Sequence, residues 1–212
     1  MNTQRKSGDM TDRGEGRMEL IEYYVQNVLP HVERQRILNY LRPEYRSISD
    51  KWKEFHESQA SSVLCIGGRQ VGKTHNLLLR AILQNDLNAI IISHIPRDLL
   101  LHFLSMLDSS IQINYVKEEE HWVALRLFGR VFHFIHPRRI RRGMRFDPCA
   151  VYYDEPELYD NELSNIRYIL APFCRQEIAV GSICKPESTY FKKWYEEAEK
   201  KIRIYYEIEL RN

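Results

Sequence analysis

One run of eight residues decides the fold: Gly67-Gly68-Arg69-Gln70-Val71-Gly72-Lys73-Thr74. The run follows a short apolar segment, Ser62 to Ile66, and precedes a leucine-rich segment, His75 to Gln84. It matches the pattern GxxxxGK followed by Ser or Thr, in which backbone N–H groups at a helix N-terminus converge on a phosphate. Lys73 reaches the β- and γ-phosphates, and Thr74 offers a hydroxyl ligand to Mg²⁺. The run therefore predicts a strand, a phosphate-binding loop and a helix, against the weaker alternative of a coincidental glycine-rich turn.

An acidic pair after a later apolar run completes the expected site. Ala150 to Tyr153 is apolar, and Asp154 and Glu155 follow it directly. A metal held by Thr74 and phosphates needs a carboxylate at the end of a neighbouring strand, and this Walker B pattern supplies one. Because side chains alternate along an extended strand, we assign Asp154 to Mg²⁺ and Glu155 to the attacking water as general base. The pair favours ATP hydrolysis over transfer to a small-molecule acceptor; a plain acidic turn is the alternative.

Apolar segments of strand length alternate with helical segments along the rest of the chain. We expect strands over Asn88 to His94, Ile111 to Val116, Trp122 to Phe128, Arg130 to His136, Cys149 to Tyr153, Glu177 to Cys184 and Ile202 to Leu210. We expect helices over Ser47 to His56, Pro96 to Leu107, Asn161 to Ala171 and Glu187 to Lys200. This alternation predicts an α/β fold with a mostly parallel central sheet and helices on both faces.

The acidic pair also predicts where one strand lies. P-loop hydrolases that carry such a pair insert an additional strand between the phosphate-loop strand and the Walker B strand. Ile178 to Ser182 is the candidate for that strand. Its small tip, Gly181 and Ser182, is expected to sense the γ-phosphate, although small residues at a strand end also serve plain turn geometry.

Composition sets the expected organisation of the chain. Its 212 residues carry 31 Lys plus Arg against 29 Asp plus Glu, a net charge of +2 that fits one ordinary globular domain. We expect a disordered tail over residues 1–17, a helical N-terminal extension over 18–58 and a P-loop ATPase domain over 59–212, with no nuclease domain. No apolar run approaches the ~20 residues that span a bilayer, so we expect a soluble, intracellular chain with no membrane partner. The four cysteines lack metal-ligand spacing and are expected to be buried thiols.

A basic segment lies between two expected strands just ahead of the acidic pair. This arginine segment, Pro137 to Arg145, has five arginines in nine residues: Arg138, Arg139, Arg141, Arg142 and Arg145. Guanidinium groups match phosphate geometry. For a DNA-translocating ring, which the family resemblance described next implies, the segment is expected to grip DNA phosphates or to insert one arginine in trans into a neighbouring subunit's nucleotide site. A solvated cationic loop is the alternative.

Together these motifs resemble the ATPase domain of large terminase subunits, the DNA-packaging motors of tailed bacteriophages and related viruses. The resemblance covers roughly residues 45 to 200 and is carried by the phosphate loop, by Arg142 to Asp147, and by Gly181-Ser182 with the Lys185-Pro186 and Tyr190 to Tyr195 segments that follow. It implies that Arg69 is an in-cis arginine finger, that Lys73 and Thr74 bind nucleotide, and that Gly181-Ser182 is the coupling motif. Asp154 and Glu155 correspond to the family's metal carboxylate and base.

The resemblance also implies cofactors and partners. These are ATP and Mg²⁺, double-stranded DNA, a homo-oligomeric ring, a capsid portal and a location in the host cytoplasm. Only 57 residues follow Glu155, and an independent nuclease domain usually needs ~100 or more, so the nuclease or small terminase subunit is expected to be a separate partner unless the chain is an excised domain. Two other functions stay open: a helicase-like or DNA-remodelling ATPase, and a non-catalytic adaptor that binds nucleotide as an assembly signal.

Overall fold

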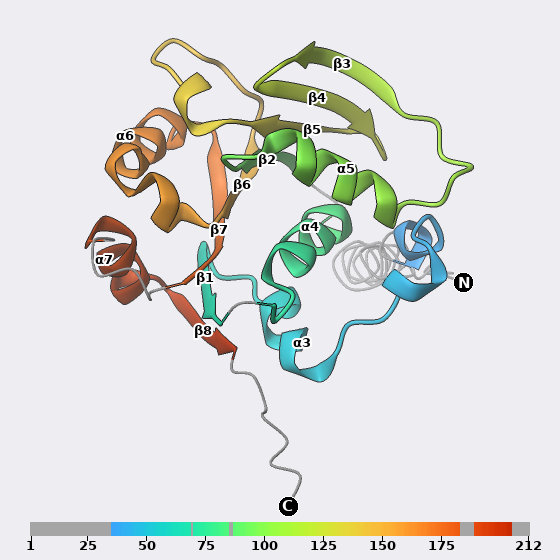
Figure 1. Cartoon of the computed structure of the whole chain (residues 1–212), viewed down its shortest axis with the longest axis horizontal. Helices are drawn as coiled ribbons and strands as arrows, with labels where there is room; N and C mark the ends of the chain where they lie inside the picture. The colour runs from blue at the N-terminus through green and yellow to red at the C-terminus, as the bar shows by residue number, and fades with distance from the viewer. Residues whose placement is uncertain (1–34, 69, 85–86, 183–188, 205–212) are drawn as a thin grey trace, which may run out of the picture.

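The computed structural model describes residues 35–68, 70–84, 87–182 and 189–204, which are built around one eight-stranded sheet (Figure 1). The strands are β1 (Ser62–Gly67), β2 (Asn88–Ile92), β3 (Asn114–Glu119), β4 (Trp122–Leu127), β5 (Arg130–Ile135), β6 (Cys149–Asp154), β7 (Cys174–Gly181) and β8 (Lys200–Ile204). Their order across the sheet is β3-β4-β5-β2-β6-β7-β1-β8. In this order, every neighbouring pair from β5 through β2, β6, β7 and β1 to β8 is parallel. The β3–β4 and β4–β5 pairs are antiparallel. The predicted α/β fold with a mostly parallel sheet is confirmed.

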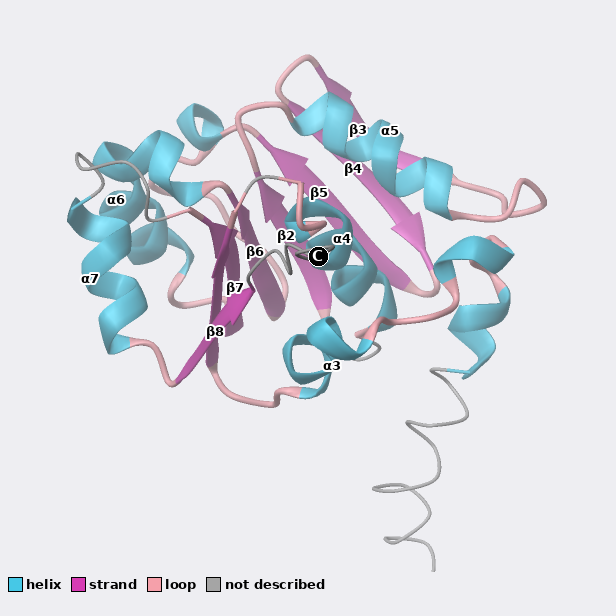
Figure 2. Ribbon diagram, turned by 60° about the horizontal axis from the view of Figure 1, so that its bottom comes forward, coloured by secondary structure: helices cyan, strands magenta, loops and turns pink. Residues whose placement is uncertain are grey.

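Helices cover both faces of this sheet (Figures 1 and 2). One face carries α4 (Lys73–Leu83) and α5 (Pro96–Met106), and the other carries α6 (Asp160–Leu170) and α7 (Thr189–Glu197). Alternate residues of a strand pack on opposite faces: Val63 and Cys65 lie in the core cluster that contains α4 and α5, whereas Leu64 lies in the cluster that contains α6 and α7. Because both faces are buried, the central strands are apolar at successive positions without alternation.

Strand β7 lies between the phosphate-loop strand β1 and the Walker B strand β6. Ile66 of β1 pairs with Gly181, and Asp154 of β6 pairs with Val180, so the carboxyl ends of the three strands lie at one edge of the sheet. The predicted insertion of this strand is confirmed. Ligands of open parallel α/β sheets bind at this kind of edge, outside the carboxyl ends of the strands.

The described part of the N-terminal extension packs onto the sheet domain. Residues 35–39 are helical, and the 3-10 turn η2 (Pro43–Tyr45) and the helix α3 (Asp50–Glu57) follow. Trp52 and Phe55 of α3 are buried in the core cluster that also contains α4. The tail expected over residues 1–17 lies outside the described residues, as does most of the helical segment expected before residue 35.

Several predicted boundaries need correction. The strand expected over Glu177 to Cys184 is β7, which begins three residues earlier, and Lys200, expected at the end of a helix, begins β8. The strand expected over Ile111 to Val116 is β3, which begins three residues later. Ile111 and Ile113 pack against the core before the strand begins, while β3 itself is an edge strand with mostly exposed side chains. The helix expected from Ser47 begins at Asp50, after an extended Ser49. The last expected strand is described only as far as Ile204, and none of the described helices is long and apolar enough to cross a membrane.

Candidate active site

The phosphate loop connects β1 to α4 at the carboxyl edge of the sheet. Gln70 and Gly72 have positive φ angles of 61° and 85°, which turn the chain into the first residue of α4, Lys73. Gly67 is needed for close packing, because a Cβ there would lie 2.9 Å from the backbone oxygen of Ile204. The strand, loop and helix predicted from the sequence are therefore present, and Gly67 and Gly72 stand where a side chain would clash or strain the backbone.

Lys73 folds back over the loop. Its ammonium donates hydrogen bonds to the carbonyl oxygens of Gly67, at 3.0 Å, and Gly68, at 2.5 Å. Arg69, which the sequence predicts as an in-cis finger, lies outside the described residues. The loop is also held from α3, because the indole N–H of Trp52 donates to the carbonyl of Val71 at 3.2 Å. The N-terminal extension thus buttresses the loop that carries the lysine.

Thr74 and Asp154 meet across the sheet edge. The Thr74 hydroxyl donates to Asp154 Oδ1 at 2.8 Å, and the Ser93 hydroxyl, just beyond β2, approaches Asp154 Oδ2 at 3.5 Å. Asp154 is only 4% exposed. Burial raises the pKa of Asp154 to about 6; the hydrogen bond from Thr74 opposes this rise, and the neighbouring Glu155 charge adds to it. Ser93 belongs to no recognisable motif, although a polar residue at the end of an apolar strand is the signal that marks it.

These groups fit a magnesium ion. Hydroxyl and carboxylate oxygens are the hard ligands that Mg²⁺ takes, usually through one or two carboxylates with phosphates and waters completing the shell. A carboxylate buried with so little opposing positive charge is stabilised by a cation beside it. No group of three or more His, Cys, Asp or Glu side chains arranged for a metal occurs among the described residues.

Glu155 follows Asp154, but its geometry differs from the prediction. Strand β6 ends at Asp154, and Glu155 has φ 47° and ψ 53°, the left-handed conformation. The backbone turns at Glu155, so the extended tip expected there is wrong, and Asp154 is buried while Glu155 is exposed. The backbone N–H of Glu155 donates to the carbonyl of Val180 at 2.9 Å, which fixes this turn to β7. The Glu155 side chain is exposed at the strand end.

A third carboxylate, which no motif in the sequence marks, is buried close to this pair. Glu157 lies in the 3-10 turn η4 (Pro156–Tyr159) and is 9% exposed. Its Oε1 accepts a hydrogen bond of 2.8 Å from the backbone N–H of Ser182. Burial raises the pKa of Glu157 to about 7; the Glu155 charge adds to the rise and the Lys73 charge opposes it. The signal in the sequence was its position between Pro156 and two further apolar residues.

Gly181 and Ser182 lie at the tip of β7, as predicted. A Cβ on Gly181 would come within 2.5 Å of Glu157 Oε2 and within 2.8 Å of the Phe191 ring. Only glycine leaves room for the Glu157 carboxyl group at this strand end. The coupling role that the family resemblance assigns to Gly181 and Ser182 stays a prediction.

The arginine segment begins at the same sheet edge and leaves it. Ile135 of β5 is level with Ile92 of β2, which is level with Tyr153 of β6, so the turn η3 (Pro137–Arg139) starts at the same edge as the end of β6, with β2 between them. Phe146, at the far end, stacks edge-on against Phe173 at 6.0 Å between ring centres, next to the start of β7. The segment therefore runs along the α6 side of the sheet toward the opposite edge.

The five arginines differ in their surroundings. Arg139 pairs with Glu119. Arg138 lies 4.0 Å from Glu162, and the Arg142 guanidinium lies 6.0 Å from the ring centre of Tyr168. The Arg138, Arg141, Arg142 and Arg145 residues are exposed. Most of this positive charge is accessible to a polyanion, and the DNA and trans-finger roles stay predictions.

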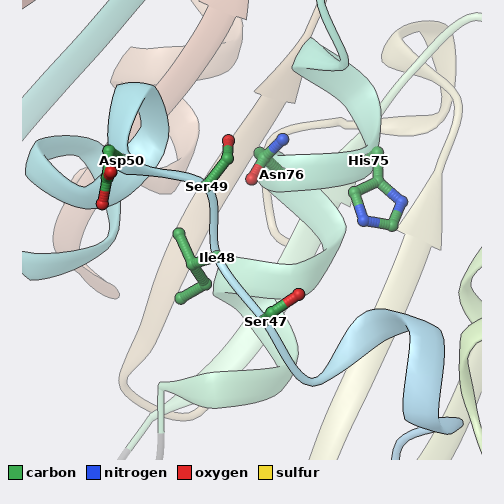
Figure 3. Close-up of a pocket in the computed structure, with 6 residues that line it drawn as sticks. All are labelled: Ser47, Ile48, Ser49, Asp50, His75 and Asn76. Atoms are coloured by element: carbon green, nitrogen blue, oxygen red, sulfur yellow. The ribbon is translucent and has the colours of Figure 1, made fainter.

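A hollow of about 470 Å³ lies on the α3 side of the phosphate loop (Figure 3). Its lining comes from the segment before α3 and from the first turn of α4: Ser47, Ile48, Ser49, Asp50, His75 and Asn76. The His75 ring lies 5.2 Å from that of Tyr45, and its Nδ1 is 3.3 Å from His102 Nε2. Burial lowers the pKa of His75, and the His102 charge lowers it further, so the imidazole is neutral near pH 7. The hollow offers one aromatic face and several hydrogen-bonding groups.

The comparisons with known proteins agree with this geometry at the level of fold. The sequence matches no protein-family model and no curated protein. Among solved structures, it is similar to a mutant of the large terminase ATPase domain of Thermus phage P74-26, with a TM-score of 0.53, 11% identity, and 80% of this chain and 83% of that chain covered. Another structure of the same ATPase domain has a TM-score of 0.51 and 14% identity, and the match covers 76% of this chain and 70% of that chain.

A third similar structure is the large terminase of a different thermophilic bacteriophage. It gives a TM-score of 0.51 at 14% identity, and the match covers 75% of this chain but only 44% of that one. The described residues thus have the P-loop fold of large terminase ATPase domains, and the resemblance found in the motifs is confirmed for the fold.

Proposed function

We propose that this chain is an Mg²⁺-dependent ATPase that works as the motor of viral double-stranded DNA packaging. The observation that carries the chemical part is the hydrogen bond between Thr74 and Asp154, which lie 80 positions apart in the sequence. It brings the hydroxyl of the phosphate loop to the carboxylate of the Walker B strand, although β7 separates the two parent strands. Hydrolysis of a nucleoside triphosphate needs this pairing.

The residues around this contact have distinct roles. Backbone N–H groups of the loop and the Lys73 ammonium bind the β- and γ-phosphates, with Arg69 as an additional charge from the loop. Thr74 and Asp154 hold Mg²⁺, which neutralises charge that develops on the phosphate oxygens. Glu155 orients a water and accepts its proton, and its exposure leaves room for that water.

The hollow beside the loop takes the base and ribose of ATP. It lies next to the first turn of α4, and His75 and Asn76 follow Thr74 directly in the sequence. A neutral His75 offers a flat face for stacking and its second ring nitrogen, since Nδ1 already contacts His102, while Ser47, Ser49 and Asp50 offer groups for ribose hydroxyls. Asn76 is already engaged by Gly72 and His56, which keeps this wall in place.

The packaging part rests on the fold and on surface charge. The similar structures are large terminase ATPase domains, and the arginine segment presents exposed guanidinium groups that suit sequence-independent phosphate contacts. The expected assembly is a homo-oligomeric ring at a capsid portal in the host cytoplasm, with a nuclease or small terminase subunit as a separate partner. In this ring an arginine of the segment either grips DNA or enters a neighbour's site.

The test is phosphate release by the full chain with Mg·ATP, measured with and without linear double-stranded DNA, alongside the mass of the assembly in solution. We expect turnover that DNA stimulates and that Lys73→Ala abolishes, while Lys53→Ala, an exposed lysine of α3, keeps it. Nucleotide binding without turnover would support the adaptor instead. Turnover coupled to strand separation would support a helicase-like enzyme.

A further inference from the structure

One oxygen of the buried Glu157 carboxyl group has no hydrogen-bond partner. Oε1 accepts from the Ser182 backbone N–H, but Oε2 is buried and is unpaired among the residues that the structure describes. Leaving a buried carboxyl oxygen without a hydrogen-bond partner destabilises the folded chain. Destabilising groups of this kind are found where the side chain has a functional role that an apolar residue could not fill.

The surroundings of Glu157 connect it to both halves of the site. Its turn begins at Glu155, the expected base. Its carboxyl group lies over Gly181, which pairs with Ile66 at the end of the phosphate-loop strand. The same strand end is tied back to the turn by the hydrogen bond from Glu155 N–H to Val180. Two bonds of opposite direction therefore join the turn after β6 to the tip of β7.

The charges that act on Glu157 also connect it to the catalytic residues and the phosphate loop. The two side chains whose charges act on Glu157 are Glu155, on the same turn, and Lys73, at the start of α4. A change in the position of either charge, such as Lys73 leaving the loop carbonyls for phosphates, changes the field at the Glu157 carboxyl group. Glu157 is placed to respond when the nucleotide state of the loop changes.

We propose that Glu157 is a positioning residue that locks the turn carrying Glu155 to the tip of β7, so that the base and the strand end move together. This inference rests on the proposed ATPase function. Removing the lock leaves the phosphate-binding groups in place, so the loss falls on turnover and spares nucleotide affinity. A residue that served only stability would change the folded fraction and leave kcat per folded molecule unchanged.

Three variants separate these possibilities. Glu157→Ala removes the acceptor of the Ser182 N–H, and Glu157→Gln keeps an acceptor of the same shape. Gly181→Ala leaves every polar group in place but drives a Cβ into the space of Oε2. We expect kcat to fall at least 10-fold in Glu157→Ala and Gly181→Ala with KM within 2-fold, and Glu157→Gln to stay within 3-fold of the unsubstituted chain. Glu118→Ala, on the exposed edge strand, is the control.

A second measurement does not depend on turnover. Amide hydrogen exchange is followed with and without a non-hydrolysable ATP analogue and Mg²⁺, in the full chain and in Glu157→Ala. The proposal predicts that the analogue changes exchange at Ser182 and across residues 155–159 together, and that Glu157→Ala uncouples the two.

The outcomes distinguish this proposal from the proposed function. If the unsubstituted chain shows no turnover, the proposed ATPase function is contradicted. The hydrogen-exchange experiment then tests the positioning role of Glu157 by itself. Normal kcat per folded molecule in Glu157→Ala, a raised KM with unchanged kcat, or exchange that stays coupled in that variant overturns the positioning role.

Discussion

The buried Glu157 predicts a measurable dependence of stability on pH. The pKa of Glu157 is raised from the ordinary 4.5 to about 7 in the folded chain. Between these values the folded state holds a proton that the unfolded chain has lost, so the free energy of unfolding falls as pH rises through this window. Each pH unit in the window is worth about 1.4 kcal/mol, which gives about 3 kcal/mol across it.

The perturbation that isolates this effect is Glu157→Gln. Glutamine cannot lose a proton, so it removes the pH-dependent part and keeps the side-chain shape. Urea unfolding of the two chains at about pH 5 and about pH 8 gives their stability difference at each pH. Relative to the unsubstituted chain, the free energy of unfolding of the Gln variant is expected to rise by about 2–3 kcal/mol from about pH 5 to about pH 8. The contributions of Asp154 and of the other titratable groups that both chains share cancel in this comparison. Glu118→Gln, at an exposed position, is expected to show no comparable gain.

A difference between the two chains that is the same at both pH values, or that shrinks toward pH 8, would refute the reasoning. It would mean that the carboxyl group is ionised in the folded chain throughout the range, either because water reaches Oε2 or because Lys73 lies closer than the structure shows. The inference that the Glu157 carboxyl group is shielded from water would then be wrong.

Three further predictions concern the acidic pair, the support of the phosphate loop and the arginine segment. Glu155→Gln is expected to keep nucleotide binding and to lower hydrolysis by on the order of 10² or more, measured by phosphate release and by equilibrium binding; lost binding would show that the roles of the acidic pair are misassigned. Trp52→Phe, which removes the N–H bonded to Val71 together with part of the buried indole, is expected to weaken nucleotide binding by about 1 kcal/mol, and calorimetry that finds unchanged binding would show that α3 does not support the loop. Neutralising the first four arginines of the arginine segment is expected to weaken DNA binding uniformly across sequences and to flatten its salt dependence in fluorescence anisotropy; if turnover collapses while DNA affinity holds, one of them belongs to a catalytic site instead.

The fold could be predicted from the sequence because its decisive signals are local. The phosphate loop fixes the order strand, loop and helix, and the paired Asp154 and Glu155 mark the class that inserts β7 beside β1. Apolar runs without alternation indicate strands covered on both faces, which the two core clusters confirm. The start of β3 was misplaced because Ile111 and Ile113 alternate like strand residues while packing from an irregular segment.

The site could be predicted only in part, because the rest of it depends on tertiary contacts. Thr74 and Asp154 were expected together, since both lie at strand or loop ends on one sheet edge. The left-handed turn at Glu155 was not visible in residue types, because glutamate seldom adopts it. Glu157 was missed because its burial arises from the tip of β7 and from Phe191, more than 20 positions away. The hollow at His75 likewise forms from two segments that the chain brings together.

The measurement that tests the account most directly is steady-state phosphate release by the full chain at saturating ATP, as a function of Mg²⁺ concentration, with and without Asp154→Asn. Asparagine keeps the shape of the group that meets Thr74 and removes the charge assigned to the metal. The account predicts turnover that requires Mg²⁺ and falls by on the order of 100-fold in the variant, with the fold unchanged by circular dichroism. Turnover in the variant equal to that of the unsubstituted chain, or turnover that is independent of Mg²⁺, would contradict it.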